Sequence, residues 1–346
     1  SDASYQNGAL WGLNNTGQNG GVAGADISAP AAWDITTGSA NVIVGVIDSG
    51  IRYTHQDLAA QMWTNPDEIP GNGLDDDGDG YIDNVFGINA IIDSGDPMDD
   101  NDHGTHVAGT IGAQANGGGP HVGVAWNVRL MALKFLDANG SGTLSDALEC
   151  INYAVAEKGR LPAQTRMILN NSWGGGGFSQ SLLNAIVASR NAGILFVAAA
   201  GNEANNNDAR PAYPATYNVD NIVSVAALNR QDQLANFSNF GANTVHLGAP
   251  GVSIFSTTSG TDTEYNSFSG TSMAAPHVAG VAALVWALFP DASLTEVRER
   301  LFVGAVPIPA LTSLTTTGGR LNAPNSLGAG PDGTLKMVAN PIGGLR

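Results

Sequence analysis

The chain has 346 residues, of which 43% are hydrophobic and only 13% are charged, so it can bury a large core without disulfide bridges. Its formal net charge is −17 and it contains no basic run, which argues against binding to nucleic acid or to an anionic membrane. No apolar run reaches the roughly 18 residues that span a bilayer, and the one cysteine, Cys150, excludes an internal disulfide.

Short apolar runs alternate with helical patterns along most of the chain. The first residues, SDASYQNG, lack the basic and apolar regions of a signal peptide, which we expect to be absent or already removed. Apolar runs predict buried parallel strands at 41–48, 129–135, 167–170, 193–199, 222–227 and 244–247. Helices are predicted at 105–114, 144–156, 180–191 and 272–288, and another at 293–302 begins with a capping box of Ser293 and Glu296. The alternation predicts an α/β fold with a central, mostly parallel sheet flanked by helices.

Two segments interrupt this alternation. Residues 64–101 are acidic and rich in glycine and proline, which predicts an insertion. Residues 328–346 show little periodicity and predict a C-terminal tail or linker. No repeat or internal boundary divides the rest, so we expect one domain over residues 1–327.

Three motifs place reactive side chains at the ends of predicted elements. Asp48 ends the strand in VIVGVIDSG, at the edge where open α/β sheets carry chemistry, although a loop-capping role is an equal alternative. His103 opens a helix in DNDHGTHVAGT. His106 follows at a spacing that does not fit a zinc helix, and we interpret it as a satisfied helix residue.

The third motif is FSGTSMAAPHVAG, in which Ser272 opens an apolar helix. A serine at this position is usually an N-cap. Here small residues surround it, so a substrate backbone is able to approach. Asp, His and Ser together suggest a nucleophilic triad, and their order excludes the α/β-hydrolases, in which the serine comes first.

These motifs resemble those of the subtilisin-like serine proteases, the subtilase family, over roughly Trp11 to Leu327. The resemblance implies a three-layer subtilisin-like fold, with His103 as general base, Asp48 orienting it and Ser272 as nucleophile. It also places Asn202, in FVAAAGNEAN, as a donor to the oxyanion, together with the backbone N–H of Ser272. Read without the resemblance, Asn202 is a plain turn residue.

The resemblance further implies a substrate groove that binds a peptide as an added β-strand. One wall is Ser172, Trp173 and Gly174, and the opposite wall is Gly140, Ser141 and Gly142. Leu144 and Trp173 are expected to line an apolar pocket, and Glu203 the rim of the first specificity pocket. The sequence NSWG also occurs in papain-like cysteine proteases, but Cys150 lies in a helical pattern and is expected to pack as a small apolar residue.

The acidic stretch LDDDGDGYIDN fits the start of an EF-hand calcium loop. The predicted ligands are the side chains of Asp75, Asp77, Asp79 and Asp83 and the carbonyl of Tyr81. Position twelve, where such loops carry a bidentate glutamate, is Phe86, and Glu68 is a candidate to replace it. The alternative is a solvated acidic loop without an ion.

Two more calcium sites are implied by the resemblance alone. Asp2 and Asp57 match the strong site of the family, with Asn116 near its third ligand, although its register is off by about one residue. Asp93, Asp96 and Asp99 lie where thermitase-like members carry another site, and the alternative is a charged loop before His103. We expect these ions to stabilise the fold and to take no part in the chemistry.

The combined prediction is a secreted, monomeric, calcium-stabilised serine endopeptidase of broad specificity with an apolar preference, which needs no zinc. Family members are made with an N-terminal pro-segment that assists folding, and this chain resembles the mature form. Two alternatives remain open: a calcium-binding scaffold with an idle triad, and a transferase or cyclase that passes the acyl group to an amine. Product analysis separates the second from a protease.

Overall fold

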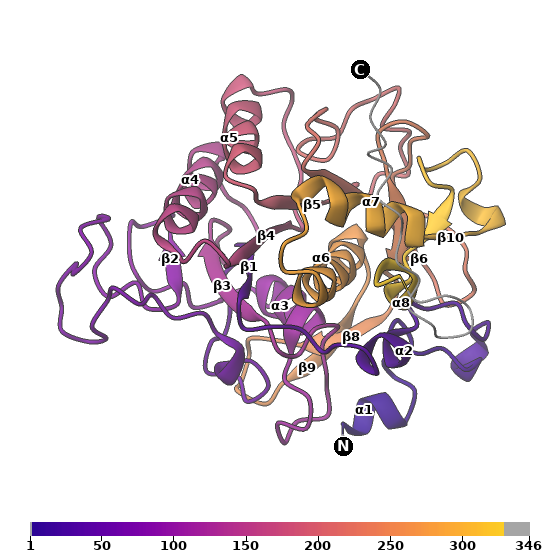
Figure 1. The fold of residues 1–346 in the computed structure, drawn as a ribbon, viewed down its shortest axis with the longest axis horizontal. Coiled ribbons are helices and arrows are strands. Elements are labelled where there is room, and N and C mark those ends of the chain that lie inside the picture. The colour runs from indigo at the N-terminus through magenta and orange to yellow at the C-terminus, as the bar shows by residue number, and fades with distance from the viewer. Residues whose placement is uncertain (1, 329–346) are drawn as a thin grey trace.

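A computed structural model describes residues 2–328, and the predicted tail at 329–346 lies outside these described residues. A nine-stranded sheet forms the centre, in the order β10-β11-β7-β6-β5-β4-β1-β3-β2 (Figure 1). All neighbouring pairs are parallel except β10 with β11. The strands are β1 Val42–Asp48, β2 Gly87–Asn89, β3 Arg129–Lys134, β4 Arg166–Asn171, β5 Leu195–Ala199, β6 Ile222–Leu228, β7 Leu247–Pro250, β10 Val306–Pro307 and β11 Gly319–Arg320, with β8 Ile254–Thr257 and β9 Tyr265–Phe268 forming a separate hairpin.

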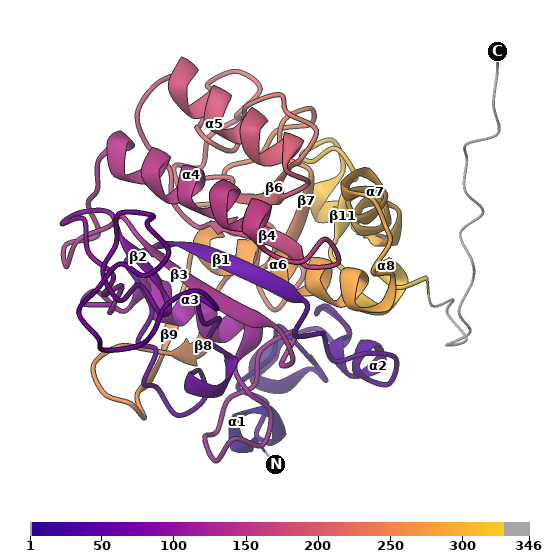
Figure 2. The ribbon, with the colours of Figure 1, turned by 60° about the vertical axis from the view of Figure 1, so that its left-hand side comes forward.

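Helices cover both faces of this sheet, which gives the predicted three layers. Helices α4 and α5 lie together on one side of β1 (Figure 2). Alternate residues of β1 face opposite sides: Val44 packs in the core shared with α3 and α6, and Ile43 in the core shared with α4 and α5. Burial on both faces explains why the strands are continuously apolar. The helices are α1 Ala3–Gln6, α2 Ala29–Trp33, α3 His103–Gly112, α4 Leu144–Arg160, α5 Gln180–Asn191, α6 Thr271–Leu288, α7 Leu294–Gly304 and α8 Ala323–Ser326.

The predicted elements agree with the structure except in one strand. The prediction for β7 was wrong, because the strand occupies Leu247–Pro250 and shares only Leu247 with the predicted run 244–247. Pairing with β6 sets this register, and Pro250 is tolerated at the end of the strand. The Ser293 side chain caps α7 by accepting from the N–H of Glu296 at 3.2 Å, which is one half of the predicted capping box.

Helix α6 is long and apolar enough to pass for a membrane span, although polar residues interrupt its apolar run. However, 83% of it is buried inside the protein, as expected of a core helix. The segment 64–101 is mostly loop but contributes β2, which extends the sheet beside β3.

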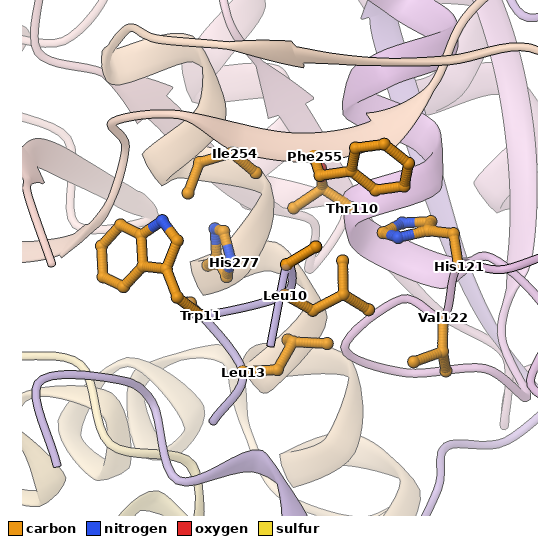
Figure 3. A pocket seen from close by; sticks show the side chains of 11 residues that line it. Leu10, Trp11, Leu13, Thr110, His121, Val122, Ile254, Phe255 and His277 are labelled. Carbon is orange, nitrogen blue, oxygen red and sulfur yellow. The ribbon is translucent and has the colours of Figure 1, made fainter. Parts of the chain in front are cut away.

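The N-terminal segment around Trp11 packs against the core beside α6. Trp11 donates from its indole N–H to the carbonyl of Val252 at 3.0 Å. Between this segment, α6 and β8 lies a cavity of about 10 Å³, the size of one water molecule, beside His277 (Figure 3). Burial lowers the pKa of His277 to about 4, so the ring is neutral at pH 7 and contributes to the core.

Candidate active site

The first pair of the predicted triad is formed by Asp48 and His103. Asp48 is the last residue of β1 and is fully buried, and His103 is the first residue of α3. The Nδ1 of His103 lies 2.7 Å from the Oδ1 of Asp48. Because the carboxylate only accepts, Nδ1 carries the proton and Nε2 is left free to act as a base.

The same pair sets the basicity of the ring. Burial opposes protonation of His103, but the negative charge and hydrogen bond of Asp48, with a further contribution from the charge of Asp99, raise its pKa. Twenty-six per cent of the His103 side chain is exposed, so the ring is open to a ligand. A base that is held, open and more basic than usual suits proton transfer from a hydroxyl group.

Ser272 lies in the first turn of α6 and is tied to Ser172, the residue after β4. Its Oγ donates to the Ser172 carbonyl at 2.9 Å. Pro276 has no N–H to give to the Ser272 carbonyl four residues earlier, and the Ser172 hydroxyl takes that place at 2.8 Å. No hydrogen bond joins Ser272 to His103 among the described contacts, so attack requires the Oγ to turn from Ser172 toward the ring.

Asn202 is held with its amide group beside Ser272. Its Oδ1 accepts from the N–H of Thr271 at 2.9 Å and from the Thr271 hydroxyl at 3.0 Å, which fixes the side-chain amide. A Cβ added to Gly270 would lie 3.6 Å from the Ser272 nitrogen and 3.7 Å from the Asn202 Nδ2. Both predicted oxyanion donors therefore border the same space.

The parallel sheet explains how these distant residues meet. Strands β5, β4 and β1 are neighbours, so their carboxyl ends share one edge. Asp48, Ser172 and Asn202 lie at or just beyond the ends of these three strands. This is the edge at which open α/β sheets bind ligands.

A cavity of about 350 Å³ opens beside this site. Of the predicted substrate residues, Gly174 and Glu203 line it, whereas Trp173 packs against Phe135 at 4.9 Å between ring centroids. Gly140, Ser141 and Gly142 form an exposed loop before α4, and Leu144 is 43% exposed. No motif pointed to the rest of the lining, because it comes from separate segments of the chain: Gly175, Gly176, Ala199, Ala200, Gly201, Asn205, Arg210, Pro211, Ala212 and Tyr213.

The acidic loop folds around its own aspartates. Asp75 accepts from the N–H groups of Gly78, Asp79 and Gly80 at 2.7–3.1 Å, as in a tight cation-binding turn. Acidic oxygens of Glu68, Asp75 and Asp77 lie within 4.8 Å of one another.

Glu68 is the most informative member of this group. Its side chain is buried, one oxygen accepts from the N–H of Asp76 at 2.8 Å, and Oε2 has no hydrogen-bond partner among the described residues. A buried, unpaired carboxylate oxygen beside two more carboxylates fits a hard cation.

Asp79 forms a second close acidic group with Asp77 and Glu157, whereas the carboxylate of Asp83 is engaged elsewhere. Asp83 accepts from the N–H groups of residues 71–73 at 2.8–3.2 Å, so the structure uses its carboxylate to hold that turn. The Tyr81 hydroxyl donates to Glu149 on α4, and the backbone carbonyl of Tyr81 as a ligand stays a prediction. Burial and the charges of Asp77 and Asp75 raise the pKa of Asp79, although the N–H of Tyr81 opposes this.

Helix α4 supplies a positive charge to the acidic loop. The guanidinium of Arg160 lies 2.8 Å from Asp77 and 2.9 Å from Glu157. Burial raises the pKa of Glu157 to about 7, despite the opposing charge of Arg160. One arginine does not balance so many acids, which favours an added cation.

Asp2 and Asp57 also come together, 55 residues apart in sequence. The Asp2 Oδ1 accepts from the backbone N–H of Asn116 at 2.9 Å, and burial and the charge of Asp2 raise the pKa of Asp57 against its hydrogen bonds. The Oδ1 of Asp57 is buried without a partner among the described residues. Asn116 is therefore at this cluster, but the contact described is made by its backbone.

The three aspartates of the third predicted calcium site, Asp93, Asp96 and Asp99, do not lie close together in the structure. Asp93 and Asp96 are exposed, and Asp96 accepts from the Tyr53 hydroxyl at 3.0 Å. Asp99 is buried with both oxygens already occupied by protein donors, so the structure gives it a role other than the predicted metal ligand. None of the three belongs to a close acidic cluster in the part of the chain described.

Two residues outside the site behave as predicted. His106 is buried, its Nε2 lies 2.9 Å from the Ile254 carbonyl, and its ring stacks on Phe268. Burial lowers its pKa to about 3, which keeps it neutral. Cys150 lies on the buried side of α4 and is part of the core.

This chain is similar to known proteins in both sequence and fold. The sequence pattern of the Subtilase family matches residues 39–330. The thermophilic serine proteinase of Bacillus sp. (strain AK1) is 39% identical over 285 residues, which cover 82% of this chain and 62% of that protein. Subtilisin-like protease 1 of Plasmodium vivax is 36% identical over 294 residues, which cover 79% of this chain and 45% of that protein.

The structural comparison agrees. A cold adapted subtilisin-like serine proteinase, solved as a crystal structure, has 28% identity and a TM-score of 0.69, and the match covers 93% of this chain and 99% of that one. This chain spans less than two thirds of the length of either relative named above. The match over residues 39–330 confirms the resemblance inferred from the motifs: the chain belongs to the subtilase family.

Proposed function

We propose that this chain is a serine endopeptidase that hydrolyses peptide bonds through Asp48, His103 and Ser272. The observation that carries the proposal is the hydrogen bond of 2.7 Å between Asp48 and His103, at the sheet edge where Ser272 and Asn202 also lie. Secretion, a folding-assisting pro-segment and a monomeric state are further parts of the proposal, carried by the family resemblance.

Each of these residues has its own role in acylation and deacylation. The Ser272 Oγ attacks the carbonyl carbon while its proton passes to His103 Nε2, and the imidazolium is stabilised by Asp48. The carbonyl oxygen becomes negative and accepts from Asn202 Nδ2 and the N–H of Ser272. His103 then gives its proton to the leaving amine, and water releases the acyl group by the same steps in reverse.

Substrate is proposed to bind as an extended strand between residues 140–142 and 172–174. Backbone pairing makes little demand on sequence, which suits broad specificity. The 350 Å³ cavity beside Asn202 has space for one large side chain, and Trp173 supports an apolar preference nearby. The direct test is release of p-nitroaniline from an apolar peptide anilide by the purified chain, with no release contradicting the proposal.

Replacing Asn202 with alanine is expected to lower kcat by on the order of 10²–10³-fold, the size of the effect known for the equivalent loss in subtilisin itself. KM is expected to change little, because the amide acts on charge that develops in the transition state. Steady-state kinetics on the same anilide checks this. Asn191→Ala, at the end of α5, is the matched control, and a small loss of kcat for Asn202→Ala would argue against the oxyanion role.

Calcium is proposed to bind at two clusters, the one around Glu68, Asp75 and Asp77 and the one around Asp2 and Asp57. Both consist of hard oxygen donors and both contain a buried carboxylate oxygen without a partner among the described residues. A bound cation would relieve the repulsion within each cluster and stabilise the native state by mass action.

Replacing Glu68 with glutamine is expected to shrink the stabilisation that calcium gives. At 100 times its Kd, one ion contributes about 2.7 kcal/mol to the free energy of unfolding. In chelator the variant is expected to be no less stable than the original, because a buried repulsive charge is gone. Thermal unfolding with and without calcium measures both effects, and Glu299→Gln on the exposed face of α7 is the control. Equal calcium dependence in Glu68→Gln and the original chain would contradict the site.

A further inference from the structure

Asp99 is a buried carboxylate surrounded entirely by donors. Four per cent of the residue is exposed. Its Oδ1 accepts from the Ser49 hydroxyl at 2.8 Å and the N–H of Asn101 at 2.9 Å. Its Oδ2 accepts from the N–H of Thr105 at 2.9 Å and the Thr105 hydroxyl at 2.5 Å.

These four partners all present hydrogens to Asp99, which favours its ionised form although burial raises its pKa. The two backbone N–H groups are able only to donate. The Ser49 hydroxyl accepts from the N–H of Gly104 at 2.9 Å, and the Thr105 hydroxyl accepts from the N–H of Arg52 at 2.9 Å, so each gives its own hydrogen to Asp99. A protonated carboxyl group would have to give up at least one of these donors.

Ser49 connects this buried charge to the catalytic pair. Its N–H donates to the Oδ1 of Asp48 at 2.7 Å, the same oxygen that meets His103. Its hydroxyl links Asp99 to Gly104, the residue after His103. Its carbonyl accepts from the buried ammonium of Lys134 at 2.7 Å.

The backbones of three segments pack closely at this point. A Cβ on Gly104 would lie 2.1 Å from the Gly50 carbonyl oxygen. A Cβ on Gly50 would lie 2.4 Å from the Pro97 carbonyl oxygen and 3.1 Å from the Asp99 Cα. The end of β1, the loop before α3 and the first turn of α3 are therefore in direct backbone contact.

We propose that Asp99 is a positioning residue for the proposed peptidase reaction, which locks the end of β1 to the start of α3 and so fixes Asp48 against His103. It does not touch the substrate. The inference rests on the proposed function, because positioning matters only if the pair does chemistry. A misplacement of about 1 Å at a catalytic group costs about 10²-fold in rate.

The charge of Asp99 also acts on the ring. The charged groups near His103 are Asp48 and Asp99, Asp102 next to it in the chain, and the ion pair of Lys134 with Asp100 beside Ser49, while His106 on the next turn is neutral. Burial lowers the pKa of His103, and the charge of Asp99 helps Asp48 to raise it. Removing that charge lowers the pKa of His103, so the acid limb of kcat/KM moves to lower pH.

The test is Asp99→Asn, which keeps the volume and removes the charge. Peptide anilide hydrolysis is expected to show kcat reduced about 10- to 100-fold, KM changed less than about twofold, and the acid limb moved to lower pH. Asp220→Asn is the matched control, because Asp220 is an exposed carboxylate that also holds two hydrogen bonds, from Arg190. It is expected to leave kcat and the acid limb unchanged.

Ser49→Ala distinguishes the positioning role of Asp99 from the effect of its charge on His103. It breaks the link between Asp99 and Gly104 but keeps the negative charge, so kcat is expected to fall while the acid limb stays in place. If Asp99→Asn does not fold, Ser49→Ala carries the test, and an unchanged kcat there overturns the proposal. A folded Asp99→Asn with unchanged kcat and acid limb overturns it as well.

Titration of the His103 ring by NMR distinguishes this inference from the proposed function. If the original chain hydrolyses no peptide, the proposed function fails, yet a lower His103 pKa in Asp99→Asn still supports the coupling. An active original chain with an unmoved His103 pKa in Asp99→Asn contradicts the inference alone.

Discussion

Ser272→Ala is expected to abolish peptide hydrolysis, with kcat falling on the order of 10⁶-fold, the size known for loss of this serine in subtilisin itself. The alanine removes the only atom that forms the acyl bond, and water attacking directly has no positioned base of comparable geometry. Release of p-nitroaniline from an apolar peptide anilide measures the loss. A fluorophosphonate probe should add mass to the original chain at Ser272 and leave the variant unlabelled.

Ser181→Ala is the matched control, because Ser181 is exposed on α5 and its hydroxyl pairs only with Ser179 among the described residues. It is expected to keep full activity and full labelling. Retained hydrolysis in Ser272→Ala, with thermal unfolding showing a folded protein, would remove Ser272 from the mechanism. A folded, calcium-loaded original chain that neither hydrolyses peptides nor takes up the probe would favour a scaffold with an idle triad.

Asp48→Asn is expected to give the next largest loss, about 10⁴-fold in kcat. The asparagine is able to turn its NH₂ group toward His103, which favours the tautomer with the proton on Nε2, where the base is needed. The negative charge that raises the pKa of His103 is also lost. Loss of this charge lowers the pKa of His103, so the acid limb of the residual kcat/KM lies at lower pH than in the original chain.

A pH profile of both proteins between about pH 4 and 9 tests the two effects together. Asp291→Asn, at an exposed aspartate before α7, is the control and is expected to change neither the rate nor the limb. A large loss of rate without a shift of the limb would mean that Asp48 acts on geometry alone. No loss of rate would contradict its place in the triad.

In the acidic clusters, the ligands predicted from sequence spacing differ in part from the contacts that the carboxylates make in the structure. The spacing of Asp75 and Asp77 predicted their convergence, because a tight loop brings alternate residues to one side. The same reasoning assigned Asp83, whose carboxylate instead holds the turn at residues 71–73. Asp99 was also assigned as a ligand from resemblance, but a buried carboxylate goes to whichever donors surround it, and here these come from Ser49 and Thr105.

The local sequence predicted the α/β alternation, the ends of most helices, and Asp48, His103 and Ser272 as candidate catalytic residues, while Asn202 came from the resemblance of its motif to the subtilases. These rest on local information: apolar runs set strands, capping residues set helix ends, and the motifs are contiguous. The register of β7, the lining of the cavity and the partners of Asp99 became known only from the folded structure. Those depend on contacts between segments far apart in the chain, such as Ser49 with Gly104 and Ser172 with Ser272, and no local pattern encodes which donors will meet which acceptors.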